Sequence, residues 1–182
     1  GKITHLFLAA GSCGTIAGVG KFLKEKNSKI KIVGIDAATS PYSSKEPKPY
    51  ENEGIGIEHP DAIFEKKYVD QVLPVTDSEA FGRTRELALR GLLVGPSSGA
   101  VMHGVYELSG SFKPTDTVVA FFADSGRAYL SKIFTEKKES VTNSLPSKTS
   151  TNISSEVNLT YFFSLRSKYE NSVLGILYLP LN

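Results

Sequence analysis

Short apolar runs alternate with helical patterns along most of this chain of 182 residues. Strands are expected at residues 2–10, 29–36, 68–75, 92–95 and 116–122, and helices at 15–26, 77–90, 98–108 and 127–134. Strands that alternate with helices form a parallel sheet through crossover connections, and the helices then cover both faces of the sheet. The sequence therefore predicts an α/β fold with a mostly parallel sheet and helices on both faces.

Composition and charge exclude several classes of protein. Lys and Arg number 21 against 19 Asp and Glu, so the net charge of +2 predicts no basic surface for nucleic acid or an anionic membrane. No run reaches the roughly 18 apolar residues of a membrane span, and no secretory signal is recognisable, so a cytoplasmic protein is expected. The single cysteine, Cys13, and three histidines without metal-ligand spacing predict no disulfide and no metal site.

The composition of the chain changes at Ser140. Residues 140–158 are dominated by Ser, Thr and Asn, which bury too little apolar surface to offset the entropy of ordering. Two apolar runs follow, at 159–165 and 172–182, without a visible partner for either. We expect residues 1–139 to form the folded unit and residues 140–182 to be a low-complexity, disordered tail.

A glycine loop, Gly11-Ser12-Cys13-Gly14-Thr15, separates the first expected strand from the first helix. At such a junction the free N–H groups of the first helical turn and the helix dipole converge on one point. Glycines let the backbone approach an anion, and Ser12 and Thr15 add hydroxyl donors, so the loop predicts a site for a phosphate group. A tight turn that needs glycine for its backbone angles alone is the other interpretation.

A dinucleotide is one candidate ligand for this loop. Gly14, Gly18 and Gly20 have a spacing found in short-chain dehydrogenases, and Asp36 ends the next strand where a ribose would bind. Against this, the first strand ends at Ala10, too early for that fingerprint, and the usual Tyr-x-x-x-Lys pair is absent. A nucleotide-binding, dehydrogenase-like protein is kept as an alternative.

Residues 37–60 form a long stretch rich in Ser, Pro, Lys and Gly. Connections of this length inside a compact domain are uncommon and are usually functional. The stretch is therefore expected to contribute to a site.

Five segments, in the same order, resemble the cysteine synthase and cystathionine β-synthase family of pyridoxal-phosphate enzymes. They are the glycine loop, the strand KIKIVGID at 29–36, YENEGIG at 50–56, GLLVGPSSG at 91–99 and DSGRAYLSK at 124–132. The resemblance covers residues 1–136. It implies the two-lobed fold of the tryptophan synthase β type, of which residues 1–139 would be an incomplete C-terminal portion of the catalytic domain.

The resemblance also implies roles for individual residues. The glycine loop would bind the phosphate of pyridoxal 5′-phosphate, and Ser97 would hydrogen-bond the pyridine nitrogen. Ser97 stands beside the start of an expected helix, so it could also act as the N-cap of that helix. Gly54, Ile55 and Gly56 would line the substrate side of the cofactor.

The implied reaction replaces the β-substituent of serine, or of an activated serine, by a thiol such as homocysteine or sulfide. A neutral hydroxyl at the pyridine nitrogen makes the ring a weaker electron sink, which suits this chemistry better than transamination. The complete family member is expected to be a homodimer that acts on small amino-acid and thiol substrates.

Two departures from the family bear on activity. Cys13 replaces the usual glycine, where its side chain could crowd the phosphate, and a thiol near a helix start could have a lowered pKa. The S-x-K-D motif with the Schiff-base lysine is absent, and no lysine has an apolar setting, so that lysine is expected upstream of Gly1. We therefore expect no catalytic residue within this chain and no turnover by the chain alone.

Two further interpretations stay open. The chain could be a non-catalytic truncated product or pseudo-enzyme that binds a full-length synthase. In the last of the five segments, Asp124 and Ser125 follow an expected strand and could simply cap the next helix.

Overall fold

The computed structural model describes residues 2–59, 66–135, 161–166 and 173–180, the last two ranges as backbone alone. Four parallel strands form the main part of one sheet, in the order β3-β2-β1-β4. They are β1 (His5–Ala9), β2 (Lys31–Ala37), β3 (Gln71–Val75) and β4 (Thr117–Phe122). β3 lies at one edge of the sheet, in keeping with Pro74, which lacks a donor for a further strand.

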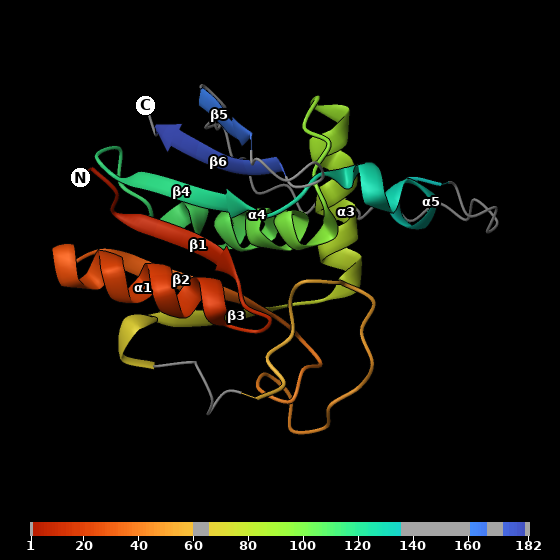
Figure 1. Cartoon of the computed structure of the whole chain (residues 1–182), viewed down its shortest axis with the longest axis horizontal. Coiled ribbons are helices and arrows are strands. Elements are labelled where there is room, and N and C mark those ends of the chain that lie inside the picture. Colours follow the sequence, from red (N-terminus) through yellow and green to blue (C-terminus); the bar gives the residue numbers. More distant parts are fainter. Residues whose placement is uncertain (1, 60–65, 136–160, 167–172, 181–182) are drawn as a thin grey trace.

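Helices cover both faces of this sheet, as the sequence predicts (Figure 1). In the view of Figure 1, α1 (Gly14–Lys26) lies in front of the sheet and α4 (Pro96–Leu108) lies behind it. α3 (Asp77–Leu89) packs against α4. The short elements are η1 (Lys66–Tyr68), η2 (Ser109–Ser111), η3 (Gly126–Tyr129) and α5 (Leu130–Ile133). Within the described residues, no helix is long and apolar enough to cross a membrane.

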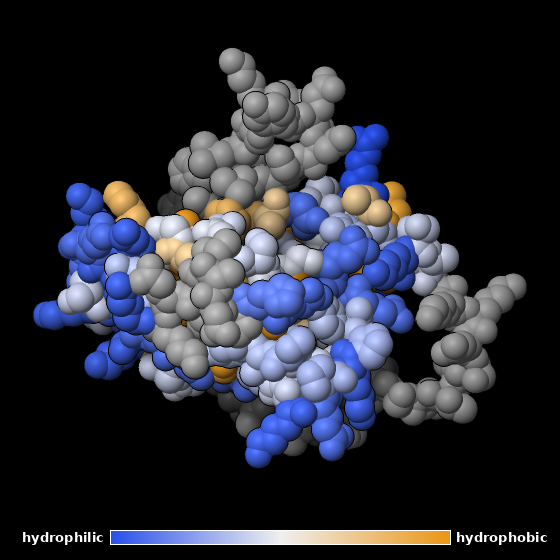
Figure 2. Space-filling view, turned by 60° about the horizontal axis from the view of Figure 1, so that its bottom comes forward, coloured by the Kyte–Doolittle hydropathy of each residue, from blue (hydrophilic) through white to orange (hydrophobic). Residues whose placement is uncertain are grey.

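Alternate residues of the strands point to opposite faces and build two cores. Phe7, Val33 and Ile35 lie in the core under α4, together with Met102 and Val105 of that helix. Strand residues of the opposite parity, Leu6, Leu8 and Ile32, lie in the core under α1, together with Ile16 of that helix. The face shown in Figure 2 carries mainly hydrophilic residues with scattered hydrophobic ones, which fits a chain that buries its apolar side chains in these cores.

α3 begins at Asp77, as the sequence predicts, after Thr76, which forms a capping box with Glu79. Element boundaries differ from the sequence prediction in three other places. α1 begins at Gly14, one residue before the expected start. Residues 92–95 form no strand, because only Val94 pairs, in a single bridge with Ser125. The expected helix at 127–134 is divided into η3 and α5.

Two strands in the C-terminal region differ from the expected disordered tail. β6 (Val173–Pro180) pairs antiparallel with β4, and β5 (Tyr161–Arg166) pairs antiparallel with β6. An unpaired edge of β4 would expose a row of N–H and C=O groups, and β6 pairs with them. The tail prediction is therefore wrong for these two segments. The rest of 140–182 lies outside the described residues, and the division of the chain at residue 139 stays a prediction.

The order of the strands places a crevice at one end of the sheet. From β1 the chain moves to β2 and β3 on one side, whereas β4 lies on the other side of β1. In open parallel sheets, ligands bind outside the carboxyl ends of the strands at this change of direction. The carboxyl ends of β1 and β4 are therefore the expected place for a ligand.

Candidate functional site

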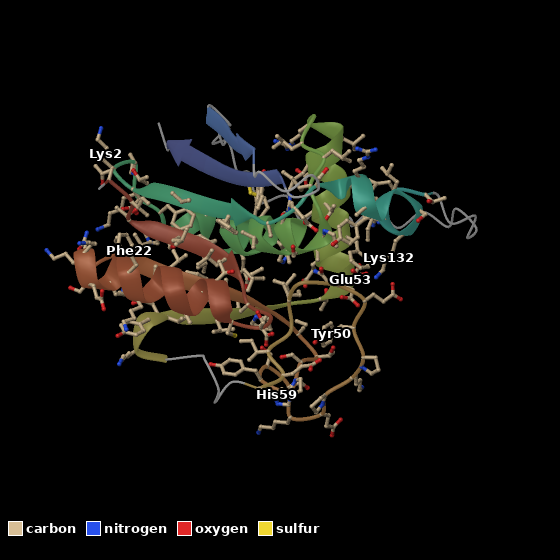
Figure 3. All side chains as sticks on the ribbon, in the orientation of Figure 1. Lys2, Phe22, Tyr50, Glu53, His59 and Lys132 are labelled. Carbon is tan, nitrogen blue, oxygen red and sulfur yellow. The ribbon has the colours of Figure 1, made fainter. Side chains whose placement is uncertain are left out.

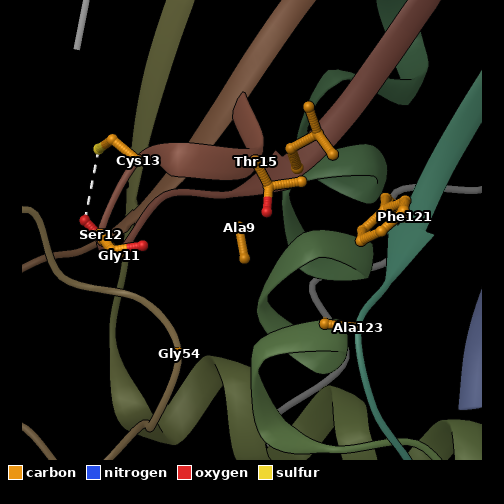
Figure 4. A pocket seen from close by; sticks show the side chains of 9 residues that line it. Ala9, Gly11, Ser12, Cys13, Thr15, Gly54, Phe121 and Ala123 are labelled. Carbon is orange, nitrogen blue, oxygen red and sulfur yellow. Dashed lines mark hydrogen bonds between the residues drawn. The ribbon is translucent and has the colours of Figure 1, made fainter. Parts of the chain in front are cut away.

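A cavity of ≈ 100 Å³ lies at this point of the sheet (Figure 4). Its walls come from the end of β1, the glycine loop, Gly54, and the end of β4 at Phe121 and Ala123. The glycine loop and the YENEGIG segment, which the sequence singles out separately, thus line the same cavity. Phe121 and Ala123 were not predicted as site residues. The only signal for them is that ligands bind at the carboxyl ends of parallel strands, where β4 ends.

The glycine loop presents donor groups to this cavity. It leads directly into α1, whose first turn contains no acidic residue that would repel an anion. The hydroxyl of Thr15 points into the cavity (Figure 4), where it adds to the N–H groups of the first turn. Lys24 and Lys26 lie in the last turn of α1, where their positive charges interact favourably with the negative end of the helix dipole. The arrangement fits a phosphate group.

Gly11 and Gly54 lie against each other because neither has a side chain. A Cβ atom at Gly11 would lie 2.9 Å from the carbonyl oxygen of Gly54. Gly54 has φ +86°, a backbone conformation that favours glycine, and a Cβ there would lie 3.3 Å from the Cβ of Ser97. Three of the segments that the sequence singles out therefore meet at Gly54.

Ser97 is the second residue of α4, and Gly95 occupies the N-cap position. The N-cap interpretation of Ser97 is therefore wrong. Its side chain is 4% exposed, and its hydroxyl makes no hydrogen bond within the described part of the chain. A hydroxyl without a protein partner, next to Gly54 in the wall of the cavity, is available to a ligand.

The other two residues of the predicted substrate side lie differently. Ile55 is buried in the core under α4 and does not line the cavity. Gly56 has φ +110°, and a Cβ there would collide with the phenol of Tyr50. Gly56 therefore serves the packing of the segment, and Gly54 alone of the three reaches the cavity.

Cys13 has a left-handed backbone conformation, with φ 64° and ψ 0°. Its Sγ turns back to the carbonyl oxygen of Gly11, 3.3 Å away, and not toward the centre of the cavity (Figure 4). Burial, and then the negative charge of Asp36, raise the pKa of the thiol. This direction is opposite to that of a reactive cysteine, so the geometry supports a small residue tolerated in the loop.

The conformation of Cys13 makes a testable prediction. Replacing Cys13 with valine is expected to lower the free energy of unfolding by about 2 kcal/mol, because a β-branched residue is strained at positive φ. Cys13→Gly is expected to change it by less than about 1 kcal/mol, since relief of strain offsets the lost side chain. Urea unfolding of the three proteins measures both values. Equal stability of the valine and glycine variants would contradict this account of the loop.

The segment at 124–132 follows the end of β4 and contacts the stretch just before Gly54. Tyr129 donates a hydrogen bond of 2.7 Å to Asp124 Oδ2, and Lys132 Nζ donates to the carbonyl oxygen of Glu51 at 2.7 Å. Lys132 also pairs with Glu53 at 3.1 Å (Figure 3). Ser125 accepts from the N–H of Arg127, so the capping interpretation holds for Ser125 but not for Asp124.

Burial raises the pKa of Asp124, with a smaller raising effect from Glu53, although the hydrogen bond from Tyr129 acts in the opposite direction. A carboxyl group whose pKa is raised on folding stabilises the fold fully below its ordinary pKa and loses that contribution as pH rises through the raised value. The wild type is therefore expected to lose stability relative to Asp124→Asn between about pH 4 and neutrality. Urea unfolding of both proteins across this range measures the difference, and a difference that grows in favour of the wild type would contradict the prediction.

Comparisons with known proteins agree with this geometry. Residues 1–124 match the family model described as pyridoxal-phosphate dependent enzyme. The chain belongs to this family of pyridoxal-phosphate-dependent enzymes. Family membership favours pyridoxal 5′-phosphate over a dinucleotide, and the side chain of Asp36 is fully buried where a ribose acceptor would have to be accessible.

Relatives of the chain are cysteine synthases and cystathionine β-synthases. It is 39% identical over 130 residues to the O-acetylserine dependent cystathionine beta-synthase of Bacillus subtilis, a match of 70% of this chain and 42% of the relative. It is 37% identical over 132 residues to a cysteine synthase of Helicobacter pylori, covering 72% and 43%. The crystal structure of the O-acetylserine dependent cystathionine beta-synthase from Helicobacter pylori superposes with a TM-score of 0.68 at 36% identity, covering 74% and 44%. The chain thus spans less than half the length of these relatives.

The residues present fit the phosphate and ring nitrogen of this cofactor. The glycine loop supplies donors without side-chain bulk at Gly11, and Ser97 has an unpartnered hydroxyl close by. None of the residues that line the described cavity is a lysine. The described site therefore offers groups that fit the phosphate and the ring nitrogen, and its described lining contains no amine that could attach the cofactor covalently.

Proposed function

We propose that this chain forms the phosphate-binding wall of a pyridoxal-phosphate site for β-replacement, in which a thiol replaces the β-substituent of serine or of an activated serine. The observation that carries the proposal is the cavity between β1 and β4, where the glycine loop and Gly54 meet close to Ser97. The sequence likeness to cysteine synthases and cystathionine β-synthases supports this substrate class.

Each group at the site has a defined part in this proposal. The N–H groups of the glycine loop and the hydroxyl of Thr15 hold the phosphate, which fixes the cofactor in the crevice. Ser97 would donate a hydrogen bond from its hydroxyl to the pyridine nitrogen and would keep its proton. Gly54 leaves room for the amino-acid substrate beside the ring. The cofactor supplies the withdrawal of electrons from the substrate Cα.

Proton transfer at the substrate Cα needs a base, and no lysine is among the described residues that line the cavity. The lysine that supplies it is expected upstream of Gly1, together with the residues that complete the site. We therefore expect no turnover by the chain alone. As a separate part of the proposal, the complete family member is a homodimer.

Reductive trapping tests this proposal. The purified chain is mixed with pyridoxal 5′-phosphate, treated with borohydride and analysed by mass spectrometry, beside an intact cysteine synthase as control. We expect reversible binding, no covalent pyridoxyl group on a specific lysine, and no thiol-dependent consumption of O-acetylserine. Stoichiometric labelling of one lysine, or turnover by the chain, would contradict the proposal.

A second candidate function follows from the absence of a lysine among the residues lining the described cavity. The chain could act as a non-catalytic partner that binds a full-length synthase. Co-purification of an intact synthase with the tagged chain would support this function, and a monodisperse monomer in the presence of the synthase would count against it.

A further inference from the structure

Asp36 is a buried carboxylate near the end of β2 that serves neither core packing nor the cavity directly. Its Oδ2 accepts hydrogen bonds of 2.5 Å from the hydroxyls of Ser40 and Ser43. Its Oδ1 accepts a hydrogen bond of 2.7 Å from the N–H of Ile57. The side chain is 0% exposed, and within the described residues it has no cationic partner. Its two oxygens are therefore satisfied by hydrogen bonds from the protein.

These three hydrogen bonds tie together the two ends of the stretch that leaves the sheet after β2, which Figure 1 shows as a long loop beyond the carboxyl ends of the strands. Ser40 and Ser43 lie at its start, and Ile57 follows 21 residues after Asp36. The neighbouring N–H of Gly56 donates to the carbonyl oxygen of Ala10, 2.9 Å away. The end of the stretch is thus fixed directly beside the glycine loop.

A second carboxylate holds the same stretch a few residues earlier. Asp77, the first residue of α3, accepts hydrogen bonds from the N–H groups of Glu51 at 2.6 Å and Asn52 at 3.1 Å. Only the short turn around Gly54 lies between the residues that these two carboxylates hold, Asn52 and Ile57. Because Gly54 lines the cavity, the position of this wall depends on both attachments.

We propose that Asp36 is a positioning residue for the substrate side of the cavity, because its hydrogen bonds to Ser40, Ser43 and Ile57 fix Gly54 against Gly11. The assignment of Gly54 to the substrate side of the cavity rests on the proposed function. The attachment of this segment to Asp36 rests on the hydrogen bonds alone. Asp36 touches neither cofactor nor substrate in this arrangement.

Hydrogen exchange of single amides tests the attachment. In Asp36→Ala, the amides of Gly56 and Ile57 are expected to exchange about tenfold faster or more than in the wild type, while those of Val33 and Ile35 are unchanged. Asp36→Asn keeps one oxygen acceptor but gives Ser40 and Ser43 a nitrogen that cannot accept, so an intermediate rate is expected. If Asp36→Ala does not fold, Asp36→Asn and the Ser40→Ala/Ser43→Ala double variant carry the test.

Asp70 provides a matched control. It also accepts a backbone hydrogen bond, from Ile32 at 2.8 Å, but it lies at the amino end of β2, away from the cavity. Asp70→Asn is expected to leave exchange at Gly56 and Ile57 unchanged. Wild-type exchange at these two amides in the folded Asp36 variants, or equal acceleration across the whole sheet, would overturn the inference.

A titration separates positioning from a merely structural role. With pyridoxal 5′-phosphate, the wild-type amide resonances of Gly14 and Gly54 are both expected to shift. In Asp36→Asn the shift at Gly14 is expected to persist and the shift at Gly54 to be lost, whereas general loosening would reduce both together and count against positioning. If the wild type shows no shift at Gly14, the proposed function fails, and the exchange experiment alone then supports or overturns the attachment by Asp36.

Discussion

Gly11→Ala is expected to weaken the binding of pyridoxal 5′-phosphate roughly tenfold or more, a loss of about 1.4 kcal/mol. The new Cβ would lie 2.9 Å from the carbonyl oxygen and 3.2 Å from the carbonyl carbon of Gly54. Both contacts are with backbone, which cannot rotate away as a side chain can. The hydrogen bond from Gly56 to Ala10 also restrains this wall, so the added methyl group must displace the glycine loop, Gly54 or both.

Isothermal titration of the wild type and Gly11→Ala with the cofactor measures this effect. Gly18→Ala is the matched control, because a Cβ at Gly18 in α1 meets no atom within 4 Å. That variant is expected to bind as the wild type does and to be more stable by up to about 1 kcal/mol, since alanine favours helix. Wild-type affinity in Gly11→Ala would show that the contact between Gly11 and Gly54 does not shape the site.

The largest expected effect on stability comes from Gly99→Ala, where α3 and α4 cross. A Cβ there would lie 2.0 Å from Thr84 Oγ1, 2.4 Å from the carbonyl oxygen of Ala80 and 2.9 Å from the N–H nitrogen of Thr84. The Thr84 hydroxyl is buried and donates to that same carbonyl oxygen, 2.7 Å away. The two helices must therefore separate, which is expected to lower the free energy of unfolding by about 3 kcal/mol or to prevent folding.

Urea unfolding of Gly99→Ala and of Gly82→Ala makes the comparison. A Cβ at Gly82, on α3, meets nothing within 4 Å, so that variant is expected to gain up to about 1 kcal/mol. A Thr84→Ala/Gly99→Ala double variant is expected to recover only part of the loss, because the contact with the backbone of Ala80 remains. A Gly99→Ala protein as stable as the wild type would mean that the helices pack less closely than the structure shows.

Local sequence patterns were sufficient for the framework of the fold. The alternation of apolar runs and helical spacing predicts the four parallel strands and the three main helices, because a buried parallel strand and an amphipathic helix each have a characteristic period. The glycine loop and Gly54 were also predicted as parts of one site. That prediction came from the order of five segments, since no local pattern relates Gly11 to a residue 43 positions later.

Local sequence patterns could not predict the features that depend on contacts between residues far apart in the chain. β6 pairs with β4, more than 50 residues earlier, so the strand that joins the run 172–182 to the sheet could not be read from the local sequence. The pairing of β5 with β6 joins the two apolar runs to each other and was missed as well. Ile55 lies inside a glycine-rich turn, yet packing turns its side chain into the core. Asp36 is a further example. Its position at a strand end is typical of a ribose acceptor, and only the structure shows that it is buried and bound by three donors.

The most direct test of the account compares pyridoxal 5′-phosphate, inorganic phosphate and pyridoxal, which lacks the phosphate, as ligands of the wild-type chain. Amide chemical shifts from Gly11 to Thr15 measure where each ligand acts. We expect the two phosphate-bearing ligands to shift these resonances and pyridoxal at the same concentration to leave them unchanged. Equal shifts with pyridoxal, or no shift in the glycine loop with any ligand, would contradict the assignment of this cavity as the phosphate site.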